Sequence, residues 1–294
     1  MSASTFRSTS LGGRLWRTCM AGAASLLFAF LMLPLLGLLT ATGWSDLVAG
    51  LRHPLALSAL KLSLFTTSVT LALVVGLGTP LAWLLARRAG RIPRAVETLL
   101  QLPIVIPPAV AGVAMLLAFG RRGLLGRWLY PEGWSLAFTT AAVIMAETFV
   151  SAPFFLQAAT SAFRRVGEDY ITVARSLGAS PARVFLRVAL PLAAPGLVSG
   201  AAMSWARSLG EFGATLMFAG NLTGKTQTLP LAIYTALESD LRVAQSLSLV
   251  LVLAAFAFLL LVRGGTARLS RRGERGDEPP ERRGDGRDAR REGA

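Results

Sequence analysis

The stretch EDYITVARSLGASPARVFLRVALP, residues 168–191, differs in character from the long apolar runs on either side of it. Apolar residues recur through its first half at the three- and four-residue spacing of one helix face. Gly178 favours a helix end, because glycine takes the left-handed terminal conformation at little cost. Ser180 and Pro181 favour a new helix start, as an N-cap residue and a first-turn proline. The stretch therefore predicts two short amphipathic helices joined by a turn, too polar to cross a bilayer.

This segment combines two apolar faces with a basic rim. The apolar residues are Tyr170, Val173, Ala174 and Leu177 in the first half and Val184, Phe185 and Val188 in the second, and the rim holds Arg175, Arg183 and Arg187. Spacing alone leaves two interpretations open, an ordinary surface helix pair or a docking surface for another subunit. For a docking surface, we expect Phe185 and its apolar neighbours to be exposed in the isolated chain.

Composition sets the broad class of the protein. The chain has 294 residues, 53% of them hydrophobic, and a mean hydropathy of +0.55. Several apolar runs exceed the roughly 20 residues that cross a bilayer as a helix. The net charge of +14 lies in loops and in the C-terminal tail, as the positive-inside rule predicts, so a nucleic-acid partner is not indicated. We therefore predict an all-α integral membrane protein.

The residue counts also exclude several kinds of site. Cys19 is the single cysteine, so no internal disulfide and no cysteine metal cluster can form. His53 is the single histidine, which excludes a histidine-based metal site. We expect no metal site and no cofactor bound by this chain.

The apolar runs predict about six membrane spans. They lie near residues 15–40, 55–86, 95–119, 135–163, 192–219 and 243–262. From them we predict a cytoplasmic N-terminal segment (1–14), an additional first transmembrane helix with an external loop (15–54), a main transmembrane domain (55–262) that includes the cytoplasmic loop 164–191, and a disordered charged cytoplasmic tail (263–294). An even number of spans places both termini and the basic loops on one side of the membrane.

Two predicted spans carry unusual residues. The third contains LPIVIPPAVAG, in which prolines remove backbone donors at a depth where only protein or a water-filled cavity replaces them. The fifth contains ARSLGEFGAT, in which Arg207 and Glu211 are four residues apart and can pair on one helix face. This pair either fixes packing or lines a translocation path at a two-fold axis. The candidate path residues are Pro107, Pro108, Arg207, Gly210, Glu211 and Gly213.

Two loops on the predicted external side carry positive charge. GRRGLLGRWLY places Arg121, Arg122 and Arg127 there, for contact with lipid headgroups or as a cationic mouth for an anion. AGNLTGKT, residues 219–226, is close to a phosphate-binding loop, but Ala219 replaces its first glycine and no strand precedes it. If transport is driven by ATP, hydrolysis must therefore belong to another subunit.

The segment 168–191 also resembles a known family motif. Ala174, Gly178 and Leu190-Pro191 match, at the same spacing, the conserved cytoplasmic loop of ABC-importer permeases, whereas Thr172 and Val173 depart from it. The resemblance implies that this loop docks on a separate ATPase subunit. The coupling-loop residues it implies are Ala174, Arg175, Leu177, Gly178, Ala179, Ser180, Pro181, Phe185, Leu190 and Pro191.

Several motifs together resemble one branch of these permeases. In chain order within residues 55–262, they are LPIVIPPAVAG, GRRGLLG, the cytoplasmic loop, ARSLGEFGAT and FAGNLTGKTQTLPLAIYTALE. They are similar to the molybdate-family oxyanion permeases, relatives of the sulfate permeases. The resemblance implies a type I ABC-importer permease fold, a homodimer in the cytoplasmic (inner) membrane, two ATPase subunits and an external or periplasmic substrate-binding protein. It implies no catalytic residue in this chain.

The expected cargo is molybdate, with tungstate as a second candidate. A sulfate or thiosulfate permease is the alternative within the family. An ion-coupled secondary transporter would instead use Glu97, Glu147 or Glu211, and it would need inverted repeats, which the sequence does not show. A membrane enzyme is disfavoured by the lone histidine and cysteine.

Overall fold

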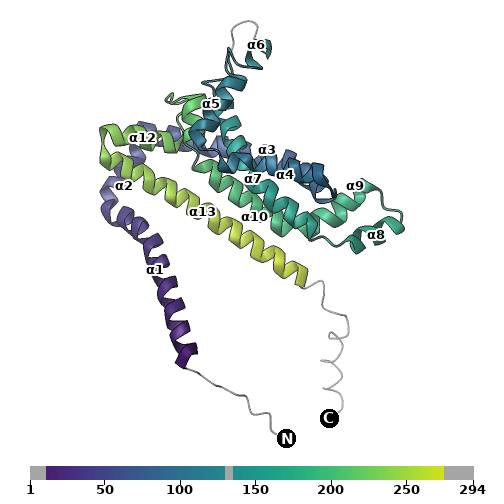
Figure 1. Ribbon diagram of the computed structural model, residues 1–294. Coiled ribbons are helices and arrows are strands. Elements are labelled where there is room, and N and C mark those ends of the chain that lie inside the picture. The colour runs from purple at the N-terminus through teal and green to yellow at the C-terminus, as the bar shows by residue number, and fades with distance from the viewer. Residues whose placement is uncertain (1–10, 130–134, 275–294) are drawn as a thin grey trace, which may run out of the picture.

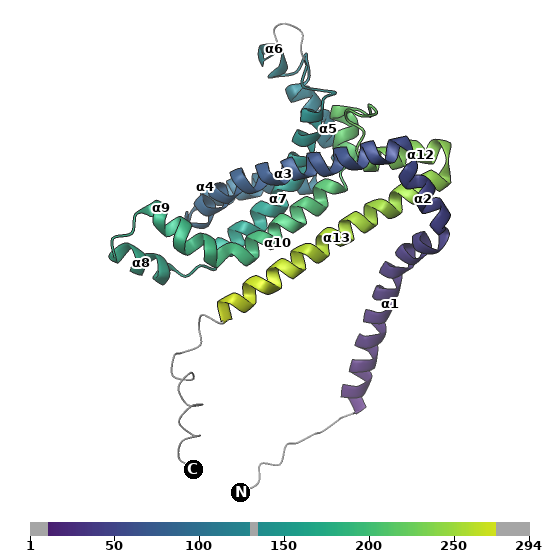
Figure 2. The same cartoon turned by 180° about the vertical axis from the view of Figure 1, so that it is seen from behind.

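The computed structural model describes residues 11–129 and 135–274, and this part of the chain consists of helices, turns and loops (Figures 1 and 2). The longer helices are α1 (Leu11–Ala41), α2 (Trp44–Arg52), α3 (Pro54–Ala86), α4 (Arg91–Val105), α5 (Pro108–Phe119), α7 (Thr140–Arg164), α8 (Glu168–Ser176), α10 (Leu190–Leu209), α12 (Leu229–Ser239) and α13 (Leu241–Glu274). The shorter ones are α6 (Gly126–Leu129), α9 (Pro181–Val184), the π-helical turn Phe185–Ala189 and α11 (Gly213–Ala219). The predicted all-α class is confirmed.

Within the described residues, five segments are long and apolar enough to cross a membrane. They are Leu15–Ala41, Leu55–Ala86, Thr140–Arg164, Pro181–Leu209 and Leu241–Val262. A sixth candidate is the pair α4 and α5, which is bent by 114°. The prediction of one span over 95–119 is therefore wrong in shape, and the bend falls at the proline pair. Pro107 is the N-cap residue of α5 and Pro108 its first residue, so neither interrupts a helix.

In three other places the helices differ from the predicted spans, loop and tail. The fifth span does not run from 192 to 219, because α10 ends at Leu209 and α11 begins at Gly213. The predicted external loop at 41–54 contains α2. Disorder was predicted from residue 263, but α13 continues to Glu274, and residues 275–294 of the predicted tail lie outside the described residues. Most of the predicted N-terminal segment, residues 1–10, also lies outside them.

The centre of the bundle is α7, which packs against α3 on one side and α10 on the other. Small residues bring α7 and α10 together: a Cβ atom added at Gly196 would lie 2.5 Å from Ala162 Cβ, and one at Gly200 would lie 2.8 Å from Ala158 Cβ. Small residues four apart allow two helix backbones to approach closely in a membrane, where packing replaces the hydrophobic effect.

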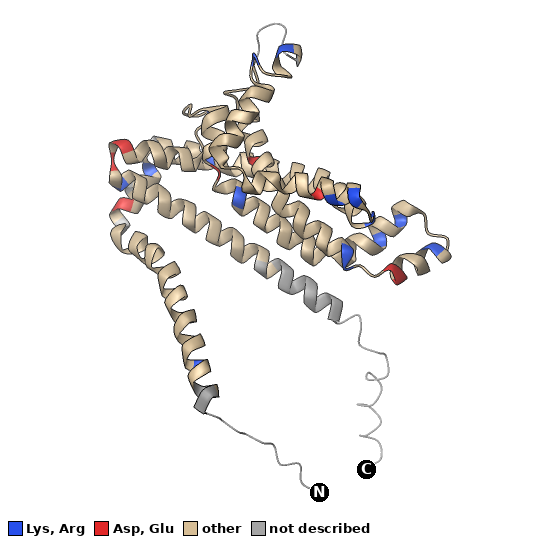
Figure 3. Ribbon diagram, viewed as in Figure 1, with Lys and Arg blue, Asp and Glu red and all other residues tan. Residues whose placement is uncertain are grey.

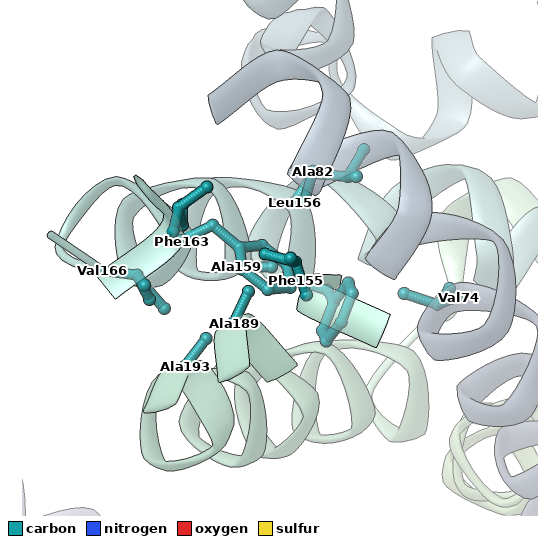
Figure 4. Close-up of a cluster of buried hydrophobic side chains, with 12 residues drawn as sticks. Val74, Ala82, Phe155, Leu156, Ala159, Phe163, Val166, Ala189 and Ala193 are labelled. Carbon is teal, nitrogen blue, oxygen red and sulfur yellow. The ribbon is translucent and has the colours of Figure 1, made fainter. Parts of the chain in front are cut away.

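A buried apolar cluster joins this centre to the cytoplasmic loop (Figure 4). It includes Phe155 and Phe163 from α7, Val184 from α9 and Ala189 just before α10. Because one cluster contains residues of both spans and loop, the loop is fixed to the bundle and is not a free linker.

The first helix, α1, stands apart from the bundle. The 18-residue apolar window within Leu15–Ala41 has no buried residue, and α1 diverges from the other helices in both views (Figures 1 and 2).

Lys and Arg gather at the end of the bundle formed by α8, α9 and the start of α4 (Figure 3). This distribution fits the predicted cytoplasmic side.

Candidate functional site

The cytoplasmic loop contains the predicted first helix and glycine turn, but the predicted second helix is not separate, because Pro181–Leu209 runs as one helix through the π-helical turn into α10. Gly178 has a φ of +79°, which is the left-handed conformation. Its N–H donates to the Arg175 carbonyl at 2.9 Å, and the Ala179 N–H donates to the Ala174 carbonyl at 3.0 Å. These two bonds form a Schellman motif, which satisfies the last carbonyls of α8. Pro181 begins α9, but the Ser180 side chain makes no capping hydrogen bond.

One face of this loop is an exposed apolar surface, which we call the docking face. It consists of Tyr170 and Val173 on α8 and of its C-cap residue Leu177, which are 61%, 58% and 83% exposed. On the opposite side of α8, Ile171 is buried in the cluster of Figure 4, and Ala174 packs against it. Exposed apolar residues gathered on one helix face favour contact with another protein.

Phe185 was expected on the exposed surface, and this expectation is wrong. The ring is half-buried, with its centroid 5.5 Å from Trp83 and 6.1 Å from Phe163. The reason is the π-helical turn Phe185–Ala189, which continues directly into α10 and places Phe185 against the end of α3. Leu186, the next residue, is 58% exposed.

The predicted ion pair in the fifth span is present, but its geometry differs from the prediction. Arg207 Nη1 lies 2.7 Å from Glu211 Oε2, although the contact is not aligned as a hydrogen bond. Glu211 does not share a helix with Arg207, since α10 has ended at Leu209. Its other oxygen, Oε1, accepts a hydrogen bond of 2.7 Å from the Ala214 N–H in the first turn of α11. The buried Glu211 carboxylate therefore links two helices across their break.

The structure also brings together two candidate path residues from different spans. A Cβ atom at Gly213 would lie 3.0 Å from Pro108 Cβ, and one at Gly112 would lie 2.7 Å from the Ala214 carbonyl oxygen. The absence of these side chains allows α5 to pack tightly on α11. Gly210 is exposed and has a φ of −88°, so its backbone does not require glycine.

Sequence reasoning missed the partners of Glu147. This carboxylate is buried on α7 and accepts hydrogen bonds from Thr66 Oγ1 at 2.8 Å and from Thr70 Oγ1 at 2.9 Å, both on α3. A signal existed, because four hydroxyl residues of α3 recur at helical spacing. They are Ser63, Thr66, Thr67 and Thr70, and all are buried. Such a polar stripe in an apolar run predicts a face that meets polar groups inside the bundle.

The segment 219–226 does not have the geometry of a phosphate-binding loop. It joins helices α11 and α12, so no strand precedes it. The Thr226 hydroxyl is buried and accepts a hydrogen bond from the Leu222 N–H at 2.9 Å. This bond closes the loop on itself and occupies the hydroxyl that stands at the last position of the motif.

The basic loop after α5, which was predicted to be external, is compact. A Cβ atom at Gly126 would lie 1.8 Å from the Gly120 carbonyl oxygen, so this turn requires glycine. Arg121, Arg122 and Arg127 are all exposed on it. Among the described residues, no group of three His, Cys, Asp or Glu side chains could hold a metal ion.

Comparison with known proteins identifies the family. Residues 78–275 match the family described as a binding-protein-dependent transport system inner membrane component. The chain belongs to this family. The molybdenum transport system permease protein ModB of Mycobacterium tuberculosis is 47% identical over 239 residues, which cover 81% of this chain and 89% of that protein. ModB of Escherichia coli is 36% identical over 215 residues, which cover 72% and 94%.

Solved ABC transporters share the fold of this inner membrane component. The structure of a bacterial ABC transporter involved in the import of alginate matches with a TM-score of 0.70 at 16% identity, over 87% of this chain and 96% of that one. The inward-facing MetNI methionine ABC transporter matches with a TM-score of 0.59 at 20% identity, over 73% and 96%.

These matches confirm the predicted fold of an ABC-importer permease, its place in the inner membrane and its role in transport rather than catalysis. Membership of a binding-protein-dependent transport family implies an ATPase and a binding protein as partners. The domain boundaries and the roles of single site residues stay predictions.

Proposed function

We propose that this chain is the permease subunit of an importer that carries molybdate, and also tungstate, across the cytoplasmic membrane. The observation that carries the proposal is its 47% identity to ModB over 89% of that protein. Two further relatives named for molybdenum transport, from Azotobacter vinelandii and Escherichia coli, are 37% and 36% identical. The exposed arginines of the loop after α5 support it, since positive charge at an entrance favours approach of an anion.

The working unit would be a homodimer with two ATPase subunits. The docking face supports this arrangement, because one exposed apolar surface per chain matches one ATPase per chain. When the two ATPase subunits bind ATP and close on each other, they would draw the cytoplasmic loops of the two permease copies together. The spans attached to them would then turn the path from inward-open to outward-open. The path residues Pro107, Pro108, Arg207, Gly210, Glu211 and Gly213 would lie near the axis between the two copies.

Competitive uptake tests the cargo. Vesicles that contain the complete complex should take up radioactive molybdate on addition of ATP and loaded binding protein. Excess tungstate should compete, and excess sulfate should compete much less. Sulfate uptake that molybdate does not inhibit would reject molybdate as the cargo and favour the sulfate branch of the family.

A further inference from the structure

Arg87 is the C-cap residue of α3, at the predicted cytoplasmic end of this helix. Its side chain contacts an aromatic ring of α3, two backbone carbonyls and a carboxylate on α8. Its side chain is 18% exposed, and its guanidinium lies 4.5 Å from the centroid of the Trp83 ring. Nη2 donates to the carbonyl oxygens of Phe163 at 3.3 Å and Val166 at 3.2 Å. Both carbonyls lie at the C-terminal end of α7, where partial negative charge favours a cation.

The same guanidinium also contacts the first residue of α8 in the cytoplasmic loop. Nη1 donates to Glu168 Oε1 at 2.7 Å, and Glu168 is the first residue of α8. The face of α8 away from the core is the docking face, so one side chain connects the helix that would meet the ATPase to α3 and α7. Because the ring of Trp83 and the two carbonyls hold the guanidinium, Glu168 pairs with a cation whose position is already fixed.

The anchor of this contact is the aromatic group at the end of α3. Trp83 packs edge-on against Phe163, with ring centroids 5.4 Å apart, and it also contacts Phe185 in the turn that leads into α10. Arg87 therefore lies where α3, α7, α8 and the start of α10 converge. A displacement of α8 at this point must either move α3 or break these contacts.

We propose that Arg87 is a positioning residue for transport, which transmits the movement of the ATPase-docking helix α8 into α3. This proposal rests on the proposed function, because it assumes that α8 docks on the ATPase and that two copies work together. It assigns to Arg87 no contact with cargo and no role in ATP hydrolysis.

The substitution Arg87→Gln tests it, in the complete complex reconstituted in lipid. Replacing Cys19 with serine removes the only cysteine. A single spin label is then placed at Ser176→Cys on α8 or at Leu57→Cys on α3, both exposed positions. A non-hydrolysable ATP analogue should change the distance between the two copies of each label. With Arg87→Gln, the change at 176 should persist and the change at 57 should be lost.

The matched control is Arg91→Gln, since Arg91 is an exposed arginine at the same end of the bundle. It should leave both distance changes intact. A full change at position 57 with Arg87→Gln, or an equal loss with Arg91→Gln, would overturn the proposal. An unsubstituted complex in which neither label moves would overturn it as well.

Transport gives an independent readout. Arg87→Gln should lower the molybdate carried per ATP hydrolysed by about 2- to 30-fold, the range for residues that carry coupling between sites. Uptake and hydrolysis that fall together, at an unchanged ratio, would indicate a merely structural role and overturn the proposal. An unsubstituted complex that shows both distance changes but no molybdate uptake would reject the proposed cargo instead, and the distances alone would then decide the role of Arg87.

Discussion

The Arg207–Glu211 pair places opposite charges where α10 ends and α11 begins. Removing one partner leaves an uncompensated buried charge, which costs about 3–5 kcal/mol in soluble proteins. We expect Arg207→Met to destabilise the subunit more than the double variant Arg207→Met/Glu211→Gln does. A double-mutant cycle on thermal unfolding in detergent measures this coupling. A coupling free energy near zero would show that the 2.7 Å contact does not stabilise the fold.

Glu147 gives a second prediction at the scale of single residues. Thr66→Val removes one of the two hydroxyls that donate to its buried carboxylate, and an unsatisfied buried acceptor costs about 1–3 kcal/mol, more if it is charged. We therefore expect a lower unfolding temperature. Thr79→Val is the matched control on the same helix, because within the described residues the Thr79 hydroxyl bonds to the Val75 carbonyl of its own helix and to no carboxylate. Equal effects of the two changes would contradict a role for the carboxylate.

At the scale of elements, the cytoplasmic loop contains exposed apolar residues on its docking face, such as Leu177, and packed ones, such as Phe185. Leu177→Asp places a charge on the docking face and should abolish co-purification of the ATPase while the subunit stays folded. Ser176→Asp is the control, since it adds the same charge at an exposed neighbouring position of α8. Phe185→Asp should instead lower the stability of the subunit itself, because the carboxylate would lie between Trp83 and Phe163. ATPase retention by the Leu177→Asp subunit would reject this face as the dock.

The turn of this loop yields a prediction about backbone conformation. Gly178→Pro should also abolish ATPase association, because proline fixes φ near −65° and this position has +79°. A Cβ atom at this position has open space around it, so the effect would come from the φ constraint and from loss of the Gly178 N–H bond to the Arg175 carbonyl, whose place the proline ring would take. Pull-down of the ATPase with the membrane-inserted variant measures it, and normal recovery would contradict the prediction.

The same element shows how far the sequence predicts the site. The helix end at Gly178 and the helix start at Pro181 are local features, and both were predicted correctly from their neighbours in the chain. The predicted apolar face was correct for Tyr170, Val173 and Leu177, whereas Ala174 packs toward the core. Phe185 was not, because its burial depends on Trp83, about a hundred residues earlier, and on a π-helical turn with no sequence signature. The bend between α4 and α5 lies at predicted prolines, but its angle of 114° depends on packing against α11.

At the scale of the whole molecule, the C-terminal end can be tested by truncation. Residues 275–294 contain many charged residues and almost no apolar ones, so they offer little to bury against a partner. Truncation after Glu274 should leave molybdate uptake within a small factor of the intact complex. Truncation within α13, after Leu249, serves as the contrast and should abolish uptake, because Leu247 and Val250 belong to a buried cluster. Loss of uptake on truncation after Glu274 would instead show that residues 275–294 have a partner.

The isolation of α1 has a consequence for how the protein is made. Within the chain its apolar window buries nothing, so it adds little to the folded stability of the other helices. It precedes the other described spans in the chain, and in the predicted topology this one added span is what places α2 on the external side. If α1 were deleted and the same topology kept, the residues before α2 would have to be translocated. The arginines after α3 would then have to set the orientation unaided. We therefore expect α1 to contribute to membrane insertion and orientation more than to packing of the bundle.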